Sequence, residues 1–400
     1  DVGGLFERDP KIPDPRGPAR RFESLSWDDA LALDGKIIQH KAVRYARERG
    51  VAFEIGGFLN PLVSRVGDEP RITIPPQNPS PPLRVAVAGC GAVGRGVVEH
   101  LAAHPDLFEV GAVLVRDPAR HAGLLGADRL LTTDPHALES ADLLIELIGG
   151  VDLSLRLVRS ALARGAHVVT ANKALIALHG PQLALLCQAQ GGSLRYSASV
   201  GGGVPMIESV RRFAARDTIT EIRGIVNGTC NFVLDRVASG RPFADAVSEA
   251  QTAGFAEADP SRDLHGVDAA EKLVVLAREA WGALLSPDDV TREPLDPHSC
   301  RKAGPGQIAR QISSVTRING SVTASVRIEA LDKESAIGRT AGPGNILTIR
   351  GETLAPLTLR GLGAGRWPTA ESVFADCLDV TLLPRESSAM NPQREAVDAV

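Results

Sequence analysis

LRVAVAGCGAVGRGVV, residues 83–98, carries the clearest information on how most of this chain folds. It begins with a short apolar run that predicts a buried strand, and it ends with apolar residues at helical spacing. Between them lies GxGxxG, which is informative when it joins a strand to a helix; the alternative is a purely structural glycine turn. Its glycines allow a tight turn and a close approach of a pyrophosphate, while the helix N-terminus supplies N–H groups for the phosphates. The pattern predicts a Rossmann dinucleotide-binding domain, whose cofactor-binding turn contains Gly89, Gly91, Ala92, Val93 and Gly94.

The second predicted strand, Val110–Val115, is followed by two residues that bear on the choice of cofactor. Arg116 can bind the 2′-phosphate of NADP, whereas Asp117 can bind the ribose 2′-OH of NAD. The two residues therefore indicate opposite preferences, and the interpretation leans slightly to NADP.

Lys173 follows another predicted strand, His167–Thr170. Ligands of open α/β sheets bind at the carboxyl ends of the strands. We therefore expect Lys173 to face the cofactor or a substrate carboxylate; the alternative is a solvated loop lysine.

GFAEADPSRDLHGVDAAEK, residues 254–272, concentrates acidic residues and a lysine in one short span. Pro260 favours a loop, and a helix with one apolar stripe is predicted from Val267. Asp268 and Lys272 are four residues apart and share one face of that helix. Either the loop and helix present a reactive lysine among carboxylates, or the two residues form an ordinary exposed ion pair worth roughly a few tenths of a kcal/mol.

Composition and charge exclude several classes of protein. The 400 residues carry a net charge of −4 with both signs interspersed, and no basic block suggests a nucleic-acid partner. No apolar run approaches the roughly 20 residues that span a bilayer, and the acidic start of the chain predicts no signal peptide. The five cysteines are widely spaced without CxxC, and the nine histidines show no metal-ligand pattern. We expect reduced thiols in a cytoplasmic protein.

The chain divides into segments of different character. The first segment combines helical and strand patterns, and seven prolines in the next one predict a stiff, extended linker. Helical patterns and β-rich runs after the Rossmann domain predict an α+β domain. The predicted boundaries are 1–60 for the first segment, 61–82 for the linker, 83–215 for the Rossmann domain, 216–360 for the α+β domain, 361–382 for a helix that returns to the Rossmann domain, and 383–400 for a tail.

Seven stretches occur in the order and at the spacing of one known family: VAVAGCGAVGRGVV, LIELIGG, VVTANKALI, SASVGGGVPMIESVRR, GIVNGTCNFVLDRV, GFAEADPSRDLHGVDAAEKLVVLA and GLGAGRWPTAESVFADC. From Leu83 to about Val380, the chain resembles homoserine dehydrogenase. The resemblance implies an α/β enzyme with a Rossmann domain and an α+β domain for substrate binding and dimerisation. It also implies the reversible NAD(P)H-dependent reduction of L-aspartate 4-semialdehyde to L-homoserine, in threonine and methionine biosynthesis, by a homodimer that pairs through residues 216–355.

The same resemblance implies roles for single residues. Lys272 matches the family's proton donor, whose pKa would have to fall toward neutrality in a buried site. Lys173 matches a lysine that lies close to nicotinamide and substrate and shares in catalysis. The other matched positions are Glu257 and Asp268 for the substrate ammonium, Asp263 beside the lysines, and the backbone of Gly254 and Gly365 near the cofactor.

A monovalent cation such as Na+ is also implied, through backbone carbonyls that match Val200, Gly202 and Val204. The family usually has an acidic ion ligand where Ser197 stands, so we expect weak binding or none. Phe255 replaces a common tyrosine and removes one hydroxyl contact. Nothing near the C-terminus resembles a regulatory ACT domain.

The N-terminal stretches DVGGLFERDP, SLSWDDALAL and KIIQHKAVRYARERGV resemble the closing segment of an aspartate kinase domain, as in bifunctional aspartate kinase–homoserine dehydrogenases. The phosphate-binding opening of such a kinase does not occur in this sequence. We therefore expect an inactive kinase remnant; the alternative is a chance α/β cap.

Two other functions compete with the enzyme hypothesis. A catalytically impaired NAD(P)-binding scaffold would fit a decaying fusion with Ser197 at the ion site. Aspartate semialdehyde dehydrogenase would need an activated cysteine nucleophile. Cys230 is the only cysteine near the site motifs, and no histidine lies beside it in the sequence.

Overall fold

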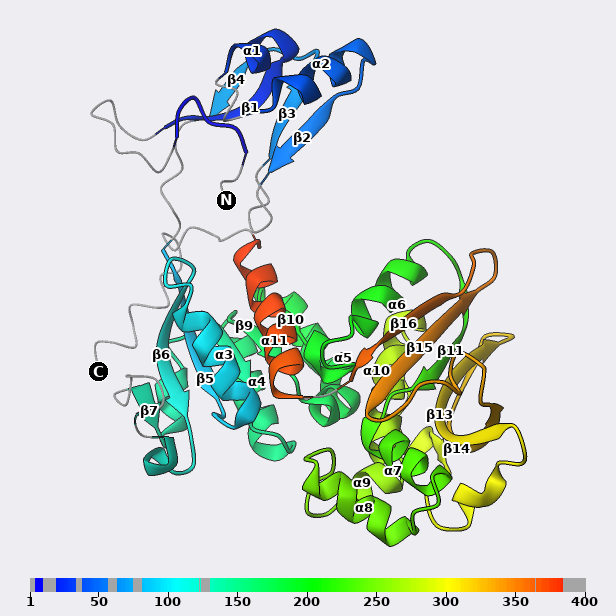
Figure 1. The fold of residues 1–400 in the computed structure, drawn as a ribbon. Helices are drawn as coiled ribbons and strands as arrows, with labels where there is room; N and C mark the ends of the chain where they lie inside the picture. Colours follow the sequence, from blue (N-terminus) through cyan, green and yellow to red (C-terminus); the bar gives the residue numbers. More distant parts are fainter. Residues whose placement is uncertain are drawn as a thin grey trace. The chain divides into compact units, whose positions relative to one another are not determined.

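The structure is a computed structural model that describes residues 4–9, 19–33, 38–56, 63–74, 81–121, 123, 130–363 and 365–383. The chain forms two compact units, one made of residues 1–81 with 378–400 and one of residues 82–377. Figure 1 labels their helices and strands. None of the helices within the described ranges is long and apolar enough to cross a bilayer.

The N-terminal unit contains a four-stranded sheet with two helices. The strand order is β2-β3-β1-β4; β1 and β3 run parallel, and the other neighbours run antiparallel. The elements are β1 (Arg21–Ser26), α1 (Trp27–Ala32), α2 (His40–Glu48), β2 (Phe53–Gly56), β3 (Val63–Gly67) and β4 (Ile72–Ile74). Ser26 caps α1, because its side chain accepts a hydrogen bond from the backbone N–H of Asp29 at 3.1 Å.

The prediction of a linker over residues 61–82 is wrong where β3 and β4 form. Val66 of β3 is fully buried in the core of the N-terminal unit. Ser24 in β1 donates a hydrogen bond to the carbonyl oxygen of Pro70 at 2.6 Å, which ties the segment between the two strands to the sheet. Pro70 lies in the segment between β3 and β4, where no ladder hydrogen bond is lost.

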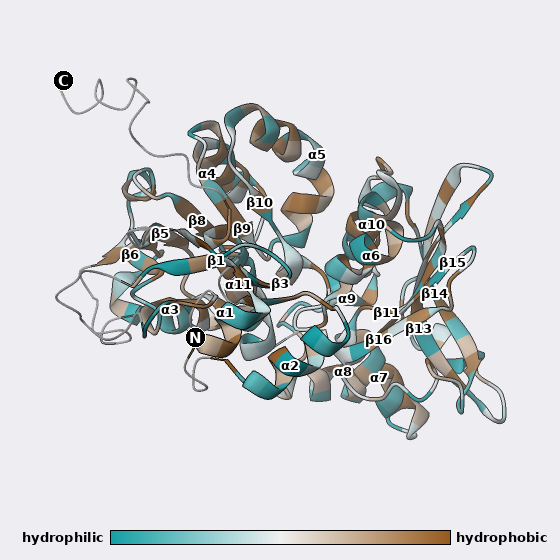
Figure 2. Ribbon diagram, turned by 90° about the horizontal axis from the view of Figure 1, so that it is seen from above, coloured by the Kyte–Doolittle hydropathy of each residue, from teal (hydrophilic) through white to brown (hydrophobic). Residues whose placement is uncertain are grey.

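Six parallel strands form the Rossmann sheet, in the order β10-β9-β8-β5-β6-β7. The elements are β5 (Leu83–Ala88), α3 (Ala92–Ala102), β6 (Phe108–Leu114), β7 (Leu131–Thr132), β8 (Leu143–Glu146), α4 (Asp152–Ala163), β9 (His167–Thr170), α5 (Lys173–Gln190) and β10 (Leu194–Arg195). Helices α4 and α3 lie on opposite faces of the sheet (Figure 2). Strand β8 is accordingly buried throughout, and β9 is buried apart from its first residue, His167. The strand order reverses between β5 and β8, which is where dinucleotides bind in this architecture.

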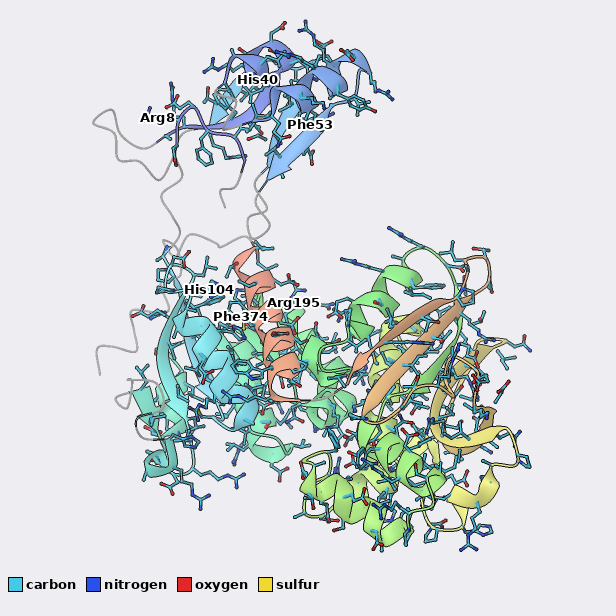
Figure 3. All side chains as sticks on the ribbon, viewed as in Figure 1. Arg8, His40, Phe53, His104, Arg195 and Phe374 are labelled. Carbon is cyan, nitrogen blue, oxygen red and sulfur yellow. The ribbon has the colours of Figure 1, made fainter. Side chains whose placement is uncertain are left out.

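Helix α11 (Arg366–Thr381) packs beside α3. Phe374 of α11 stacks on His100 with 5.1 Å between the ring centroids, and it also contacts the ring of His104 (Figure 3). Ala370 lies opposite Gly96, where a Cβ would be 3.0 Å away. The helix predicted to return to the Rossmann domain therefore closes that domain over its first helix.

A second, mainly antiparallel sheet has the order β12-β14-β13-β11-β15-β16. Its elements are α6 (Met206–Ala214), β11 (Ile219–Ile225), α7 (Gly228–Ala238), α8 (Phe243–Thr252), α9 (Ser261–Leu264), α10 (Val267–Trp281), β12 (Thr291–Arg292), β13 (Gln307–Ile318), β14 (Ser321–Asp332), β15 (Gly344–Gly351) and β16 (Leu357–Leu362). Helix α10 is buried without interruption over residues 268–277, so the prediction of a single apolar stripe is wrong. The reason is that α5, α6 and the sheet enclose α10 from several sides.

Candidate active site

The glycine turn between β5 and α3 has the geometry of a phosphate-binding loop. Gly89 adopts a left-handed φ of +102°, and a Cβ on Gly94 would lie 2.1 Å from the carbonyl oxygen of Gly89. Gly91 caps α3, and nothing lies within 4 Å of the position that its Cβ would take. The turn therefore leaves an open approach to the backbone N–H groups at the helix start, Ala92 and Val93. These residues fit the pyrophosphate of a dinucleotide.

Arg116 lies just beyond β6, at the carboxyl edge of the Rossmann sheet, and is exposed. In the described part of the chain its guanidinium has no hydrogen-bond or ion-pair partner. The neighbouring carboxylate of Asp117 is engaged, because it accepts a hydrogen bond from the backbone N–H of Ala119 at 3.1 Å and pairs with Arg120 at 3.5 Å. A free guanidinium beside an occupied carboxylate favours the 2′-phosphate of NADP.

Asp268 joins two lysines at the centre of the candidate site. Its Oδ1 lies 3.1 Å from Nζ of Lys173, and its Oδ2 lies 2.8 Å from Nζ of Lys272. Lys272 also donates a hydrogen bond to the carbonyl oxygen of Val226 at 2.7 Å. Asp268 and Lys272 are only 8% and 9% exposed, so the alternative of an ordinary exposed ion pair is wrong. Lysines from two different domains thus share one buried carboxylate.

The charges of this centre control one another. Burial alone would raise the pKa of Asp268, but the ammonium groups of Lys272 and Lys173 outweigh burial and hold that pKa well below its usual range. The charge of Asp268 raises the pKa of Lys173 in spite of burial. Burial and the charge of Asp268 raise the pKa of Asp263. The centre therefore keeps an ionised Asp268 between two cations and places a second, more basic carboxylate beside it.

Asn227 is a site residue that the sequence analysis did not single out. Its Nδ2 donates hydrogen bonds to Oδ1 of Asp263 at 2.7 Å and to Oδ2 of Asp268 at 2.8 Å. Its Oδ1 accepts a hydrogen bond from the backbone N–H of Cys230 at 2.8 Å, which caps α7. One amide therefore holds two carboxylates together, and its signal in the sequence is an Asn shortly after a strand, within the stretch GIVNGTCNFVLDRV.

The turn between β9 and α5 explains why Lys173 has a fixed position. Asn172 caps α5 and donates a hydrogen bond from Nδ2 to the carbonyl oxygen of Gly150 at 2.6 Å. The backbone N–H of Asn172 donates to Oγ1 of Thr170 at 3.0 Å, and that hydroxyl donates to the buried carboxylate of Glu146 at 2.7 Å. Lys173 is the first residue of α5 and therefore projects from a turn whose polar groups are hydrogen-bonded at its base.

Glu257 is not brought to the lysines by any hydrogen bond or ion pair among the described residues. It lies on the exposed loop before α9, and its backbone carbonyl accepts a hydrogen bond from Gln251 at 3.2 Å. Gly254 and Gly365, the two glycines predicted near the cofactor, have φ of +76° and +133°, so both positions favour glycine for the backbone conformation itself.

The loop predicted to hold a cation is strongly bent. Gly201 has a φ of +91°, and a Cβ there would lie 2.5 Å from the carbonyl oxygen of Val204. That carbonyl already accepts a hydrogen bond from the backbone N–H of Met206 at 2.7 Å. Gly202 also adopts a left-handed φ, of +55°, while Val200 is fully buried. No group of three or more His, Cys, Asp or Glu side chains suited to a metal ion occurs among the described residues.

A carboxylate does approach Ser197, but it comes from α11. The backbone N–H and the hydroxyl of Ser197 donate hydrogen bonds to Asp376 at 2.8 and 2.7 Å. Asp376 is 4% exposed, and burial raises its pKa to about 6. The family usually has an acidic residue at the position of Ser197. In this chain the carboxylate beside that position comes from Asp376, in a distant part of the sequence.

The thiol of Cys230 is unsuited to nucleophilic catalysis. It is fully buried, its Sγ donates to the carbonyl oxygen of Asp263 at 3.2 Å, and burial raises its pKa well above the ordinary value. A reactive cysteine needs an accessible thiolate. The structure therefore offers no support for the aspartate semialdehyde dehydrogenase alternative.

Comparisons with known proteins identify the family of the chain. The family model for homoserine dehydrogenase matches residues 205–378, and the model for the NAD-binding domain of homoserine dehydrogenase matches residues 89–197. The homoserine dehydrogenase of Pseudomonas aeruginosa is 33% identical over 314 residues, which cover 75% of this chain and 72% of that protein. That of Corynebacterium glutamicum is 33% identical over 324 residues, which cover 76% and 72%.

Solved structures give the same answer for the fold. A homoserine dehydrogenase from Thiobacillus denitrificans matches with a TM-score of 0.70 at 32% identity, over 75% of this chain and 73% of that one. A hyperthermophilic archaeal homoserine dehydrogenase in complex with NADPH matches with a TM-score of 0.65 at 25% identity, over 76% and 98%. With the matched domain models and the glycine turn that fits a dinucleotide, these likenesses establish that the chain belongs to the homoserine dehydrogenase family of NAD(P)-dependent oxidoreductases.

Proposed function

We propose that Lys272 is the proton donor in the reversible reduction of L-aspartate 4-semialdehyde to L-homoserine by NADPH or NADH, in threonine and methionine biosynthesis. The observation that carries this proposal is the buried ammonium of Lys272, fixed between Asp268 and the carbonyl oxygen of Val226 on the rigid helix α10. When bound, the nicotinamide would supply the hydride for the aldehyde carbon. The aldehyde oxygen then needs a proton, and a positioned ammonium can deliver it.

The remaining side chains suit the substrate's own charges. Oδ1 of Asp268 accepts from Lys173 at 3.1 Å, and a carboxylate oxygen has room for a second donor, such as the substrate ammonium. We assign the same ligand to Glu257 on the neighbouring loop. Lys173 takes the substrate carboxylate or the edge of the cofactor, and Asp263 supports the lysine side of the site.

NADP is the cofactor that the residues favour, and Arg116 is proposed as the group that binds its 2′-phosphate. The glycines of the turn before α3, together with the backbone of Gly254 and Gly365, complete the proposed cofactor site. A monovalent cation is proposed at the carbonyls of Val200, Gly202 and Val204. It is supported by the approach of Asp376 to Ser197 and opposed by the hydrogen bond that Val204 already accepts.

A homodimer through the β-rich region 216–355 is also proposed. Strand β16 is an edge strand with almost all residues exposed, including Leu357 and Leu362 at 37% and 53%. Exposed edges of this kind are unusual unless another chain covers them. Light scattering on purified protein should give twice the mass of the chain, and a monomer at micromolar concentration would remove this proposal.

The N-terminal unit is proposed to be an inactive remnant of an aspartate kinase, in the domain order given above. Because β3 and β4 belong to its sheet, the remnant reaches at least Ile74 rather than residue 60. The five cysteines are free, which accords with the proposed cytoplasmic location. Purified protein should not phosphorylate aspartate with ATP; such activity would refute the proposal that the kinase segment is inactive.

The central experiment measures NADPH oxidation with aspartate semialdehyde. Wild-type protein should oxidise NADPH only when the semialdehyde is present. Lys272→Ala should lower kcat by about 100- to 10,000-fold, the usual contribution of a general acid, while NADPH still binds. Lys333→Ala, at an exposed lysine of the same domain, is the matched control and should keep full activity. Near-normal turnover in Lys272→Ala would disprove the mechanism, and cofactor binding without oxidation in wild type would favour the scaffold.

A further inference from the structure

Helix α5 contains an interior Gly180-Pro181 pair, which is unusual for a helix of 18 residues. Proline has no N–H, so the carbonyl oxygen of Ala177, four residues earlier, loses its intrahelical donor. Glycine removes the side chain on the same stretch of the helix. The pair therefore creates a socket, defined here as the carbonyl oxygens of Ile176 and Ala177 together with the space at Gly180.

Arg278 of helix α10 fills this socket. Its Nη1 donates to the carbonyl oxygen of Ile176 at 2.7 Å, and its Nη2 donates to that of Ala177 at 3.0 Å. A Cβ on Gly180 would lie 2.2 Å from Nη1 and 3.2 Å from Cζ, so a side chain there would force the guanidinium out of this position. Pro181 leaves a carbonyl oxygen without its helical donor, and Gly180 leaves space for a side chain from another helix. The planar guanidinium of Arg278 occupies that space and donates to the carbonyl oxygens.

The two joined helices are those that carry the lysines. Lys173 is the first residue of α5, one turn before the socket, and Lys272 is on α10 less than two turns before Arg278. Both helices belong to one buried core cluster, in which Ile176 and Leu276 are fully buried. Each residue of helix advances about 1.5 Å, so a slide of one residue along α5 would break a 3.1 Å ion pair.

We propose that Arg278, seated in the Gly180-Pro181 socket, is a positioning residue that locks α5 against α10 so that Lys173 and Lys272 share Asp268. Apolar contacts alone leave packed helices able to shift by small sliding movements, as in shear motions. The two hydrogen bonds from a rigid guanidinium do set it. This inference rests on the proposed roles of the two lysines.

The test compares wild type with Arg278→Lys, Gly180→Ala and the double variant. Lysine cannot reach two carbonyls as a fork, and the added methyl of Gly180→Ala excludes the guanidinium although alanine has the higher helix propensity. Each single variant should lower kcat by about 10- to 100-fold, as a misplacement near 1 Å does. The Kd for NADPH should change less than about threefold, because the phosphate site lies on α3.

The double variant gives the decisive result. Both changes empty the same socket, so the double variant should have the kcat of the worse single variant. Losses that multiply, or normal kcat in both single variants, would overturn the proposal. Leu178→Ala, at an exposed position of α5, is the control and should keep wild-type kcat.

Failure of this inference can be told apart from failure of the proposed function. Suppose that wild type is active, that Lys272→Ala is inactive, and that the socket variants have normal kcat. The positioning role of Arg278 would then be refuted, while the proposed function would stand. If wild type has no activity, urea unfolding of the same four proteins still tests the socket, since a shared contact requires non-additive changes in stability. Should Gly180→Ala not fold, Arg278→Lys and Arg278→Met decide: lost kcat with retained NADPH affinity supports the positioning role, and normal kcat overturns it.

Discussion

Replacing Asp268 with Asn removes the one negative charge that two ammonium groups share. Asn keeps the shape of the side chain, and the distances to be broken are 2.8 Å to Lys272 and 3.1 Å to Lys173. Unit charges about 3 Å apart attract by ~6 kcal/mol at an effective dielectric constant of about 20. Most of that attraction offsets the desolvation of the buried charges, and removing one partner of a buried pair costs about 3–5 kcal/mol.

The two lysines do not contribute equally to this cost. The side chain of Lys173 on α5 is 34% exposed, whereas that of Lys272 on α10 is 11% exposed. Water therefore screens the ion pair of Lys173, and most of the loss comes from the ion pair of Lys272. We expect Asp268→Asn to lower the free energy of unfolding by about 3 kcal/mol.

The pH dependence has a definite sign. The pKa of Asp268 is held well below its usual range, so its contribution to stability is present above the pKa of the unfolded state and is lost as the pH falls through the folded pKa. The difference between wild type and Asp268→Asn should stay constant from about pH 5 to 8 and should narrow only below about pH 4.

Urea unfolding at several pH values, with kcat measured at neutral pH, tests this reasoning. Asp288→Asn is the control, because Asp288 is 95% exposed and pairs with Arg292 at 3.7 Å; its effect should stay within about 0.5 kcal/mol. A stability loss below about 1 kcal/mol for Asp268→Asn, or an unchanged kcat, would show that Asp268 is not the shared counter-ion of the lysines.

The other predictions concern the cofactor site, the Ser197 contact and Asn227. Arg116→Ala should raise the KM for NADPH about 10- to 100-fold, the loss of a charge-assisted contact, and leave the KM for NADH unchanged; equal effects on both cofactors would exclude a 2′-phosphate contact. Burial raises the pKa of Asp376 to about 6, so wild type should lose stability as the pH rises from about 4 through 6. Asp376→Asn, which can still bond both groups of Ser197, should therefore be more stable than wild type by about 1–3 kcal/mol at pH 8 and equal to it near pH 4, measured by thermal unfolding. Asn227→Ala removes the cap of α7 and the donor shared by two carboxylates, and chemical denaturation should show a loss of about 2–3 kcal/mol; a loss under about 0.5 kcal/mol would contradict this role.

The Rossmann domain and the family could be predicted from the order of the amino acids alone. The strand, the glycine turn and the helix of residues 83–98 are encoded within a few residues, because each depends on local backbone freedom and on the period of apolar side chains. Lys173 and Lys272 could be singled out in the same way, since each stands in its own short motif. The same approach gave a wrong prediction for residues 61–82. Proline density is a local signal, whereas the pairing of β3 and β4 with β1 depends on contacts between distant residues.

The assembly of the site, in contrast, depends on contacts between distant parts of the folded chain. Asp268 bonds a lysine from another domain, and Asp376 reaches Ser197 across 179 residues of sequence. The burial of α10 on all sides, which turns a commonplace helical ion pair into a buried charge centre, likewise depends on elements far away in the chain. Such contacts form when loops close and helices pack, and no periodicity along a single segment records which distant partner will cover it.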